Sequence, residues 1–369
     1  MVLIKNIDDI LSSYNKKDFD YKKVIKRNNI NVRFEKDDGS FKKELPKDDN
    51  TLLIITDPGF SGTYLKNLNK YKNAYIWTIE EESITEVEKI ITAFPQPSKI
   101  MGFGGGRALD VAKMTAFRLE KPLISAPTAP SHDGLIAKNC ALKMLGKKKS
   151  FSTGYPMQII VPEHLWASSG DLKRAGAIDI ASNVVSLQDV SLSMKQTNFL
   201  PDYEHMTYSL LAVRKILEEQ TMNSLAEALI MSGLAMDKHS NYCSGSEHEV
   251  EKAISASGLG NNGPGTYLHG QLAGTGALIA AKIYEMYADR IPDGLFFDKK
   301  MLYGEIRRLF HKYDVLQLAL KPLIEKRDVI EKILKNLSAV RPERYTLWNI
   351  IDSKEVNWKQ VLDEIMDEN

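Results

Sequence analysis

The chain has 369 residues, of which 43% are hydrophobic, a size and composition that suit two domains with buried cores. Its 49 basic and 48 acidic residues give a formal net charge of +1, so the chain as a whole lacks the charge signature of a protein that binds nucleic acid or an anionic membrane. The 2 cysteines exclude a disulfide framework and no apolar run is long enough to span a membrane, so we expect a cytoplasmic globular protein without a signal peptide.

The first part of the chain alternates short apolar runs with helical patterns. TLLIIT (51–56) predicts a buried strand that ends in a turn at Asp57, Pro58 and Gly59. The Lys-rich run GKKKS (146–150) predicts a solvated hairpin or loop. Strands that alternate with helices favour a parallel sheet with helices on its faces. Further strands are predicted at 73–79, within KIMGFGGG (99–106), at 121–128 and at 157–162, and helices at 83–94 and 107–119.

The rest of the chain has helical periodicity, and no clear strand intervenes. The sequence therefore predicts an α/β domain over residues 1–168 and an all-helical domain over residues 169–369. Helices are predicted at 206–220, 222–236, 268–287, 299–313 and 321–337.

A glycine-rich stretch, GFGGGRALDVAKM (102–114), joins a predicted strand to a predicted helix. Glycines at such a junction let a phosphate approach the backbone N–H groups at the positive end of the helix. Arg107 breaks the G-x-G-x-x-G spacing and no Lys-Ser/Thr pair follows, which disfavours a nucleoside-triphosphate loop. The stretch alone is compatible with a phosphate site or with a tight turn that binds nothing, and Asp110 could cap either.

The next predicted strand ends in PTAPSHDG (127–134), which concentrates polar side chains in one loop. In open parallel sheets, ligands bind beyond the carboxyl ends of the strands, so this loop and the glycines are expected to serve one ligand. Thr128 and Ser131 are candidate hydrogen-bonding contacts to a cofactor, and Asp133 is a candidate anchor for a substrate hydroxyl. His132 is expected to orient the loop.

His248 and His269 are the candidate metal ligands among the 7 histidines. His248 lies at a predicted helix start, and His269 begins a helix whose small residues permit a close helix contact. Two helix-borne imidazoles and a carboxylate would form a three-ligand site with an open position, which is typical of a catalytic metal. HEVEK is not the metalloprotease motif HExxH, because Lys252 stands where the second imidazole would be.

Two aspartates are candidates for the carboxylate ligand. Asp171 follows Gly170 and has the pattern of a helix N-cap. Asp179 lies within a helical pattern, between Ile178 and Ile180, where a carboxylate needs a partner. A metal ion would supply that partner.

Together these motifs resemble the glycerol-1-phosphate dehydrogenases, a family related to polyol dehydrogenases, iron-type alcohol dehydrogenases and dehydroquinate synthase. The resemblance covers roughly residues 50–350. The most specific match is PTAPSHDG, which closely resembles the family's loop PTxxSHDG. GFGGGRALDVAKM resembles the family's cofactor loop GGGKxxDxAK. RAGAIDIASNVVSLQD resembles a helix that carries the metal carboxylate, which selects Asp179. SGSEH and YLHGQLAGTGAL resemble the segments with the other two ligands, and RPERYTLWNII (341–351) resembles a C-terminal stretch.

The resemblance implies a dehydroquinate synthase-like fold, with a Rossmann-like α/β N-terminal domain and an all-α C-terminal domain. It also implies a homo-oligomer that interconverts dihydroxyacetone phosphate and sn-glycerol 1-phosphate, with NAD(P)(H) and a divalent metal, first of all Zn²⁺ but also Ni²⁺, Fe²⁺ or Mn²⁺. The implied site consists of the metal ligands Asp179, His248 and His269, the catalytic residues Asp133 and Asp179, which bind substrate together with Lys252, and the cofactor contacts Asp57, Gly105, Gly106, Arg107, Ala108, Leu109, Asp110, Thr128 and Ser131.

Some residues depart from the family pattern. Ile178 stands where Gly or Ala is usual, Val190 where Trp is usual, and Gln271 where Glu is usual. Lys252 replaces the histidine that contacts substrate, although a lysine could pair with a phosphate as a point charge. A polyol dehydrogenase without a phosphate requirement and a dehydroquinate synthase-like cyclase therefore remain alternatives. The acidity of Asp57 favours NAD over NADP, whereas nearby bases such as Lys66 would favour NADP.

Overall fold

The structure, a computed structural model, forms two compact units, Asp20–Lys173 and Met1–Phe19 with Arg174–Asn369. The prediction of a domain over residues 1–168 included the first helix, which the structure groups with the helical unit. The reason is that α1 (Val2–Ser13) buries its apolar face on α8 (Tyr203–Glu218), where Asp8 lies 3.3 Å from Arg214. The residues described are 2–14, 19–36, 42–46, 49–61, 65, 71–260, 266–337 and 340–367.

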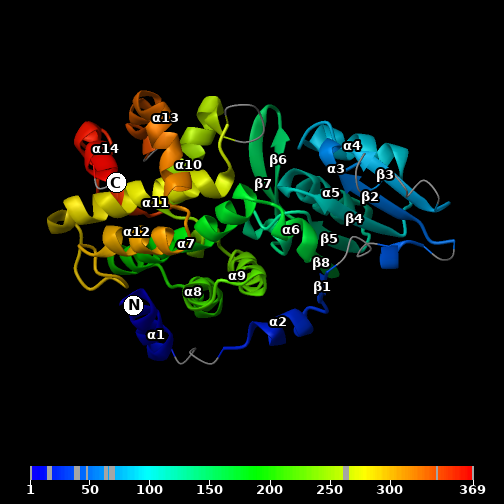
Figure 1. Ribbon diagram of the computed structural model, residues 1–369, viewed down its shortest axis with the longest axis horizontal. Coiled ribbons are helices and arrows are strands. Elements are labelled where there is room, and N and C mark those ends of the chain that lie inside the picture. Colours follow the sequence, from blue (N-terminus) through cyan, green and yellow to red (C-terminus); the bar gives the residue numbers. More distant parts are fainter. Residues whose placement is uncertain are drawn as a thin grey trace. The chain divides into compact units, whose positions relative to one another are not determined.

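The α/β unit contains a 6-stranded sheet in the order β1-β8-β5-β4-β2-β3, and every pairing in it is parallel (Figure 1). This confirms the parallel sheet and the predicted strands. The additional strand β1 is a half-exposed edge strand, which explains its weak sequence signal. The strands are β1 (Asn31–Glu35), β2 (Leu52–Thr56), β3 (Ala74–Thr78), β4 (Lys99–Gly104), β5 (Leu123–Pro127) and β8 (Gln158–Pro162); the helices are α2 (Tyr21–Arg27), α3 (Pro58–Ser61), α4 (Ile84–Ala93), α5 (Gly106–Leu119) and α6 (Glu163–Ala167).

Strand β2 shows why the sheet is buried on both faces. Leu53 and Ile55 contribute to the core that includes residues of α4 and α5, and Leu52 and Ile54 contribute to a second core on the opposite face. Successive residues of a strand point to opposite faces, so covering both faces requires a continuous apolar run. This is the run TLLIIT that the sequence presents.

The strand order places the glycine loop at a topological switch point. From β2 the chain continues to the neighbouring strand β3 and then returns to β4 on the other side of β2. Ligands of open α/β sheets bind where the order reverses in this way, at the carboxyl ends of the strands. Asp57 directly follows β2 and Gly105 directly follows β4, so both lie at this point.

The Lys-rich run forms part of an antiparallel hairpin made of β6 (Asn139–Met144) and β7 (Lys147–Ser152). Leu145 and Gly146 form its turn with φ angles of 53° and 75°, the left-handed geometry of tight hairpin turns. The lysines of β7 are exposed. The prediction of a solvated hairpin or loop is confirmed.

The other unit is helical, and among its described residues the β-structure is a single isolated bridge, between Gly260 and Tyr267. Its central helix is α7 (Asp171–Gln196), which is buried on all sides from Ala175 to Ser193. No helix in the described part of the chain is long and apolar enough to cross a membrane. The remaining helices are α9 (Met222–Ala235), α10 (Ser246–Ile254), α11 (His269–Met286), α12 (Leu302–Lys312), α13 (Leu316–Leu334) and α14 (Trp358–Asp367). The predicted helices are confirmed by α8, α9, α11, α12 and α13, whereas α14 is an additional helix.

Candidate metal centre and cofactor loop

Three side chains of the helical unit form a candidate metal centre. Asp179 on α7, His248 on α10 and His269 on α11 have ligand atoms that all lie within 4.8 Å of one another. Nε2 of His248 lies 3.6 Å from Oδ1 of Asp179, and Nε2 of His269 lies 3.5 Å from the same oxygen. Ligands of one tetrahedral zinc ion are separated by about 3.4 Å, since each lies about 2.0–2.1 Å from the ion. The spacing therefore fits a shared divalent cation.

The positions of Asp171 and Asp179 along α7 explain why only Asp179 lies at this centre. Asp171 is the exposed first residue of α7, whereas Asp179 is 3% exposed. At about 1.5 Å of rise per residue, the two lie about 12 Å apart along the helix. A carboxylate as deeply buried as Asp179 requires positive charge nearby, which the imidazoles or a metal ion supply.

The electrostatics of the centre favour a cation. Burial disfavours the charged form of His248, but hydrogen bonds to Asp179 and Glu247 outweigh it and raise the pKa of His248 to about 9. Burial also opposes the charged form of His269, yet the charges of Glu251 and Asp179 raise its pKa. The carboxylates therefore stabilise positive charge here, either a proton or a metal ion.

Glycines of α11 allow the helices that carry the candidate ligands to meet. A Cβ atom on Gly270 would lie 2.0 Å from the carbonyl oxygen of Ala175 on α7, and one on Gly276 would lie 2.1 Å from that of Glu247 on α10. A Cβ on Gly274 would lie 2.2 Å from Cγ2 of Ile178. The predicted close contact of the small-residue face is confirmed, and the glycine at 274 accommodates the unusual Ile178.

Asp189, to which the sequence assigned no role, holds the first residue of α10 by a hydrogen bond. This buried carboxylate accepts hydrogen bonds from the hydroxyl of Tyr284 (2.6 Å) and from the amides of Ser246 (2.5 Å) and Leu347 (3.0 Å). Burial, together with the nearby charge of Glu247, raises the pKa of Asp189 to about 7. Its role became visible only from these long-range contacts.

The C-terminal motif RPERYTLWN fastens the segment before α10. Nη1 of Arg341 donates to Oγ of Ser244 (2.9 Å), and Arg344 donates to the carbonyl of the same serine. Oγ1 of Thr346 donates to Oε2 of Glu249 (3.2 Å). Burial and the nearby charge of Asp189 raise the pKa of Glu249 to about 8. These contacts explain physically why a segment so far along the chain belongs to the site.

Lys252 lies on the same helix as His248, one turn further on, and is exposed. Residues four apart on a helix share a face, so Lys252 is expected on the face of α10 that carries His248. Burial opposes the charged form of the adjacent Glu251, but the charge of His269, and to a smaller extent that of Lys252, hold the pKa of Glu251 well below its ordinary value. The predicted contact between Lys252 and substrate stays a prediction.

In the α/β unit, the glycine loop packs against an acidic side chain. Oδ2 of Asp57 accepts a hydrogen bond from the amide of Gly105 (2.8 Å), and a Cβ atom on Gly104 would lie 2.5 Å from that oxygen. Burial raises the pKa of Asp57, although the bond from Gly105 opposes this. Asp57 thus holds the loop, and its predicted contact with the ribose stays a prediction, while Lys66 lies outside the described residues.

His132 packs between two glycines. A Cβ atom on Gly106 would lie 2.4 Å from Nε2 of His132, and one on Gly134 would lie 2.3 Å from Cε1. Nδ1 of His132 accepts a hydrogen bond from the amide of Gly134 (2.9 Å). The imidazole therefore joins the two loops and orients the segment that carries Asp133, as the sequence suggested.

The predicted cofactor contacts differ in where their side chains lie. Leu109 is buried against Gly102, and Asp110 accepts a hydrogen bond from the amide of Ala141 (3.0 Å), so both serve the packing of α5. Arg107 donates to the carbonyl of Glu80 (3.0 Å). The first helical turn of α5 leaves the amides of 106–108 outside the helix's own hydrogen bonds. Beyond β5, Thr128 is buried and Ser131 is half-buried. That these residues and Ala108 contact a cofactor stays a prediction.

Lys113 is a buried lysine that ties α5 to the loop after β5. Its Nζ donates to the carbonyls of Gly134 (2.6 Å) and Asn139 (3.0 Å) and lies 3.6 Å from Oδ1 of Asp110. Lys113→Met should lower the free energy of unfolding of this unit by about 3 kcal/mol, because the carbonyls of Gly134 and Asn139 would lose their donor and the half-buried Asp110 a nearby counter-charge. Urea titrations will measure this; Lys149→Met, at an exposed lysine of β7, is the control, and equal midpoints for both variants would contradict the expectation.

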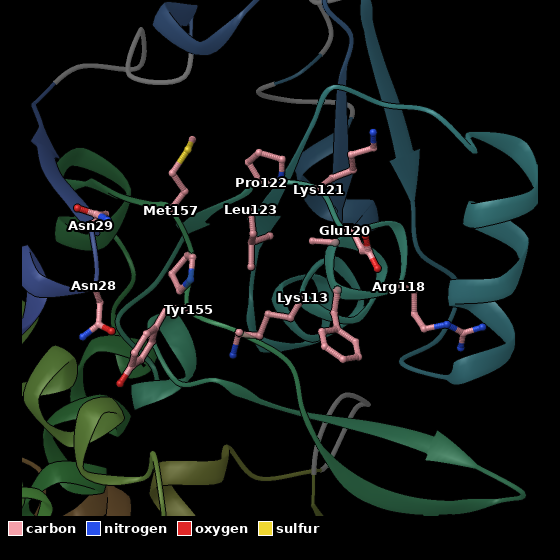
Figure 2. A pocket seen from close by; sticks show the side chains of 14 residues that line it. Asn28, Asn29, Lys113, Arg118, Glu120, Lys121, Pro122, Leu123, Tyr155 and Met157 are labelled. Carbon is pink, nitrogen blue, oxygen red and sulfur yellow. The ribbon is translucent and has the colours of Figure 1, made fainter.

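A cavity of about 640 Å³ lies at the other end of the same sheet (Figure 2). Leu123, which begins β5, and Met157, which precedes β8, line it, so it opens at the amino ends of the strands. Figure 2 shows Lys113 on its wall as well. Ligands of parallel sheets bind at the carboxyl ends, so this cavity is not the predicted cofactor site.

Comparisons with known proteins give the family and the fold of this chain. The model of the family described as iron-containing alcohol dehydrogenase matches residues 37–168. Glycerol-1-phosphate dehydrogenase (NAD(P)+) of Metallosphaera sedula is 30% identical over 80% of this chain and 84% of its own, and that of Sulfurisphaera tokodaii is 31% identical over 83% of each. The crystal structure of glycerol dehydrogenase from Schizosaccharomyces pombe aligns with a TM-score of 0.63 at 16% identity, over 92% of this chain and 88% of that one, which shows a shared fold.

Proposed function

Because this chain belongs to the glycerol-1-phosphate dehydrogenase family, we propose that it interconverts dihydroxyacetone phosphate and sn-glycerol 1-phosphate with NAD(H) or NADP(H). The observation that carries this proposal is the convergence of Asp179, His248 and His269 in a member of that family. When bound, a divalent ion supplies Lewis acidity, which stabilises negative charge on the C2 oxygen of the substrate. One carboxylate and two imidazoles suit Zn²⁺ first, and also Ni²⁺, Fe²⁺ or Mn²⁺.

The protein's own residues bind and orient the reactants in this proposal. Asp133 holds a substrate hydroxyl and passes a proton through water, and the exposed ammonium of Lys252 pairs with the phosphate. The amides at the start of α5, around Gly106 and Arg107, receive the pyrophosphate of the cofactor at the positive end of the helix. Asp57 contacts the adenosine ribose while it holds the loop, and Thr128 and Ser131 donate hydrogen bonds to the cofactor.

The cellular setting belongs to the same proposal. The product, sn-glycerol 1-phosphate, would provide the glycerol backbone of phospholipids. We expect the enzyme to work in the cytoplasm as a homo-oligomer. Size-exclusion chromatography with light scattering will test the assembly, and a monomer would contradict it.

The decisive experiment measures oxidation of NADH and of NADPH with dihydroxyacetone phosphate, before and after chelation and with zinc added back. We expect sustained oxidation that stops on chelation and returns with metal. Faster oxidation with unphosphorylated dihydroxyacetone would indicate a polyol dehydrogenase instead. A cyclase of the dehydroquinate synthase kind would give no net oxidation, because it reoxidises its nucleotide within each turnover.

Lys252→Ala should raise KM for dihydroxyacetone phosphate by about tenfold with a smaller change in kcat, since loss of a point-charge contact amounts to about 1.4 kcal/mol of binding. KM for unphosphorylated dihydroxyacetone should not change. Steady-state kinetics with both substrates will measure this, and Lys332→Ala, at an exposed lysine of α13, is the matched control. An unchanged KM for the phosphorylated substrate would show that Lys252 is only a solvated helix residue.

A further inference from the structure

We propose that Glu247 and Glu251 are positioning residues of the metal centre, each holding one imidazole by Nδ1 so that Nε2 faces Asp179. This inference rests on the metal chemistry of the proposed function. Neither acid belongs to the three-residue cluster, and each contacts a different imidazole. The two acids are four residues apart on α10 and therefore share one face of it.

Glu247 holds the ligand that follows it in the chain. Its Oε1 lies 2.7 Å from Nδ1 of His248, and the carboxylate is completely buried. Oε1 is itself fixed by the hydroxyl of Ser186 on α7 (2.6 Å) and by the amide of Gly245 (2.8 Å). A carboxylate oxygen fixed by these two donors leaves the imidazole one orientation.

Glu251 on α10 contacts the candidate ligand on the neighbouring helix α11. Its Oε1 lies 3.3 Å from Nδ1 of His269, the first residue of α11, and it accepts a hydrogen bond from Oγ of Ser255 (2.7 Å). Glu251 is 4% exposed, whereas the side chain of His269 is 34% exposed. Helix α10 thus supplies one ligand and also the acid that orients a ligand carried by another helix.

The chemistry of imidazole explains what these contacts do. A neutral imidazole has one N–H and one lone pair, and a carboxylate that accepts the hydrogen at Nδ1 leaves the lone pair on Nε2. In both histidines, Nε2 is the nitrogen that approaches Asp179, at 3.6 and 3.5 Å. The acids therefore set the tautomer and the ring orientation that metal binding needs. Loss of such a partner typically weakens metal affinity by about 10- to 100-fold.

The test measures zinc affinity of the full-length protein by competition with a chromogenic chelator. Glu251→Ala should raise the zinc dissociation constant by about 10- to 100-fold, and Glu251→Gln, which keeps an acceptor for Nδ1–H, should recover part of the loss. Glu249→Gln is the matched control, because Glu249 on the same helix faces Thr346 and not an imidazole. Thermal unfolding of the metal-free variants will show that each is folded.

A zinc dissociation constant for Glu251→Ala equal to that of the unchanged protein would overturn the inference, and so would equal losses in Glu251→Ala and Glu249→Gln. Because Glu251 is nearer the surface than Glu247, its variants provide the test even if Glu247→Ala does not fold. Failure of the unchanged protein to bind zinc would also overturn it. Tight zinc binding without oxidation of NADH by dihydroxyacetone phosphate would instead refute the proposed reaction and leave this inference standing.

Discussion

Replacing His269 with alanine is expected to lower turnover of dihydroxyacetone phosphate by at least about 1,000-fold, because a Lewis acid contributes several kcal/mol to stabilising the transition state. The variant would leave Asp179 and His248 as the remaining ligands of a cluster whose atoms now lie within 4.8 Å. Two ligands hold a divalent ion far more weakly than three, so zinc should be lost on dialysis. Metal analysis and single-turnover kinetics will measure both effects.

The effect of His269→Ala should be confined to the helical unit. Affinity for NADH, measured by fluorescence titration, should stay within about twofold, since the proposed cofactor contacts lie in the α/β unit. His311→Ala, at an exposed histidine of α12, is the control for a general effect of histidine loss. Retention of full activity by His269→Ala would remove the proposed metal centre.

Gly270→Ala is expected to destabilise the helical unit by about 2 kcal/mol and to weaken metal binding. Its new Cβ would lie 2.0 Å from the carbonyl oxygen of Ala175, a backbone atom that cannot move without shifting α7. Alanine has a better helix propensity than glycine by about 1 kcal/mol, but this gain is smaller than the cost of forcing two helices apart. Displacement of α11 also moves His269 relative to Asp179.

Gly304→Ala provides the matched control, since Gly304 is also helical but a Cβ there would have no atom within 4 Å. This variant should be more stable than the unchanged protein, by up to about 1 kcal/mol. Chemical denaturation and zinc competition will compare the two variants. If both glycine variants are equally stable and bind zinc equally well, the close approach of α11 to α7 is not what holds the centre together.

Much of the centre was predictable because its signals are local. The candidate ligands Asp179, His248 and His269 stand in motifs that single them out, and an aspartate between isoleucines signals a buried partner. Glu247 and Glu251 can be read from the sequence, but their spacing alone does not show which imidazole each one contacts. That assignment depends on how α10 and α11 pack against each other. Gly276 permits their close packing, but the sequence alone does not predict its geometry.

The sequence by itself determined the alternation of strands and helices, the parallel sheet and the glycine loop, because hydrophobic periodicity and glycine placement record which faces of each element are buried. Only the tertiary structure decided that α1 packs with the helical unit, that β1 pairs with β8, and that Asp110 and Lys113 face inward to tie down the loop after β5. These are contacts between segments distant in the chain, and a residue's local pattern shows that it is buried or polar without showing which partner it meets.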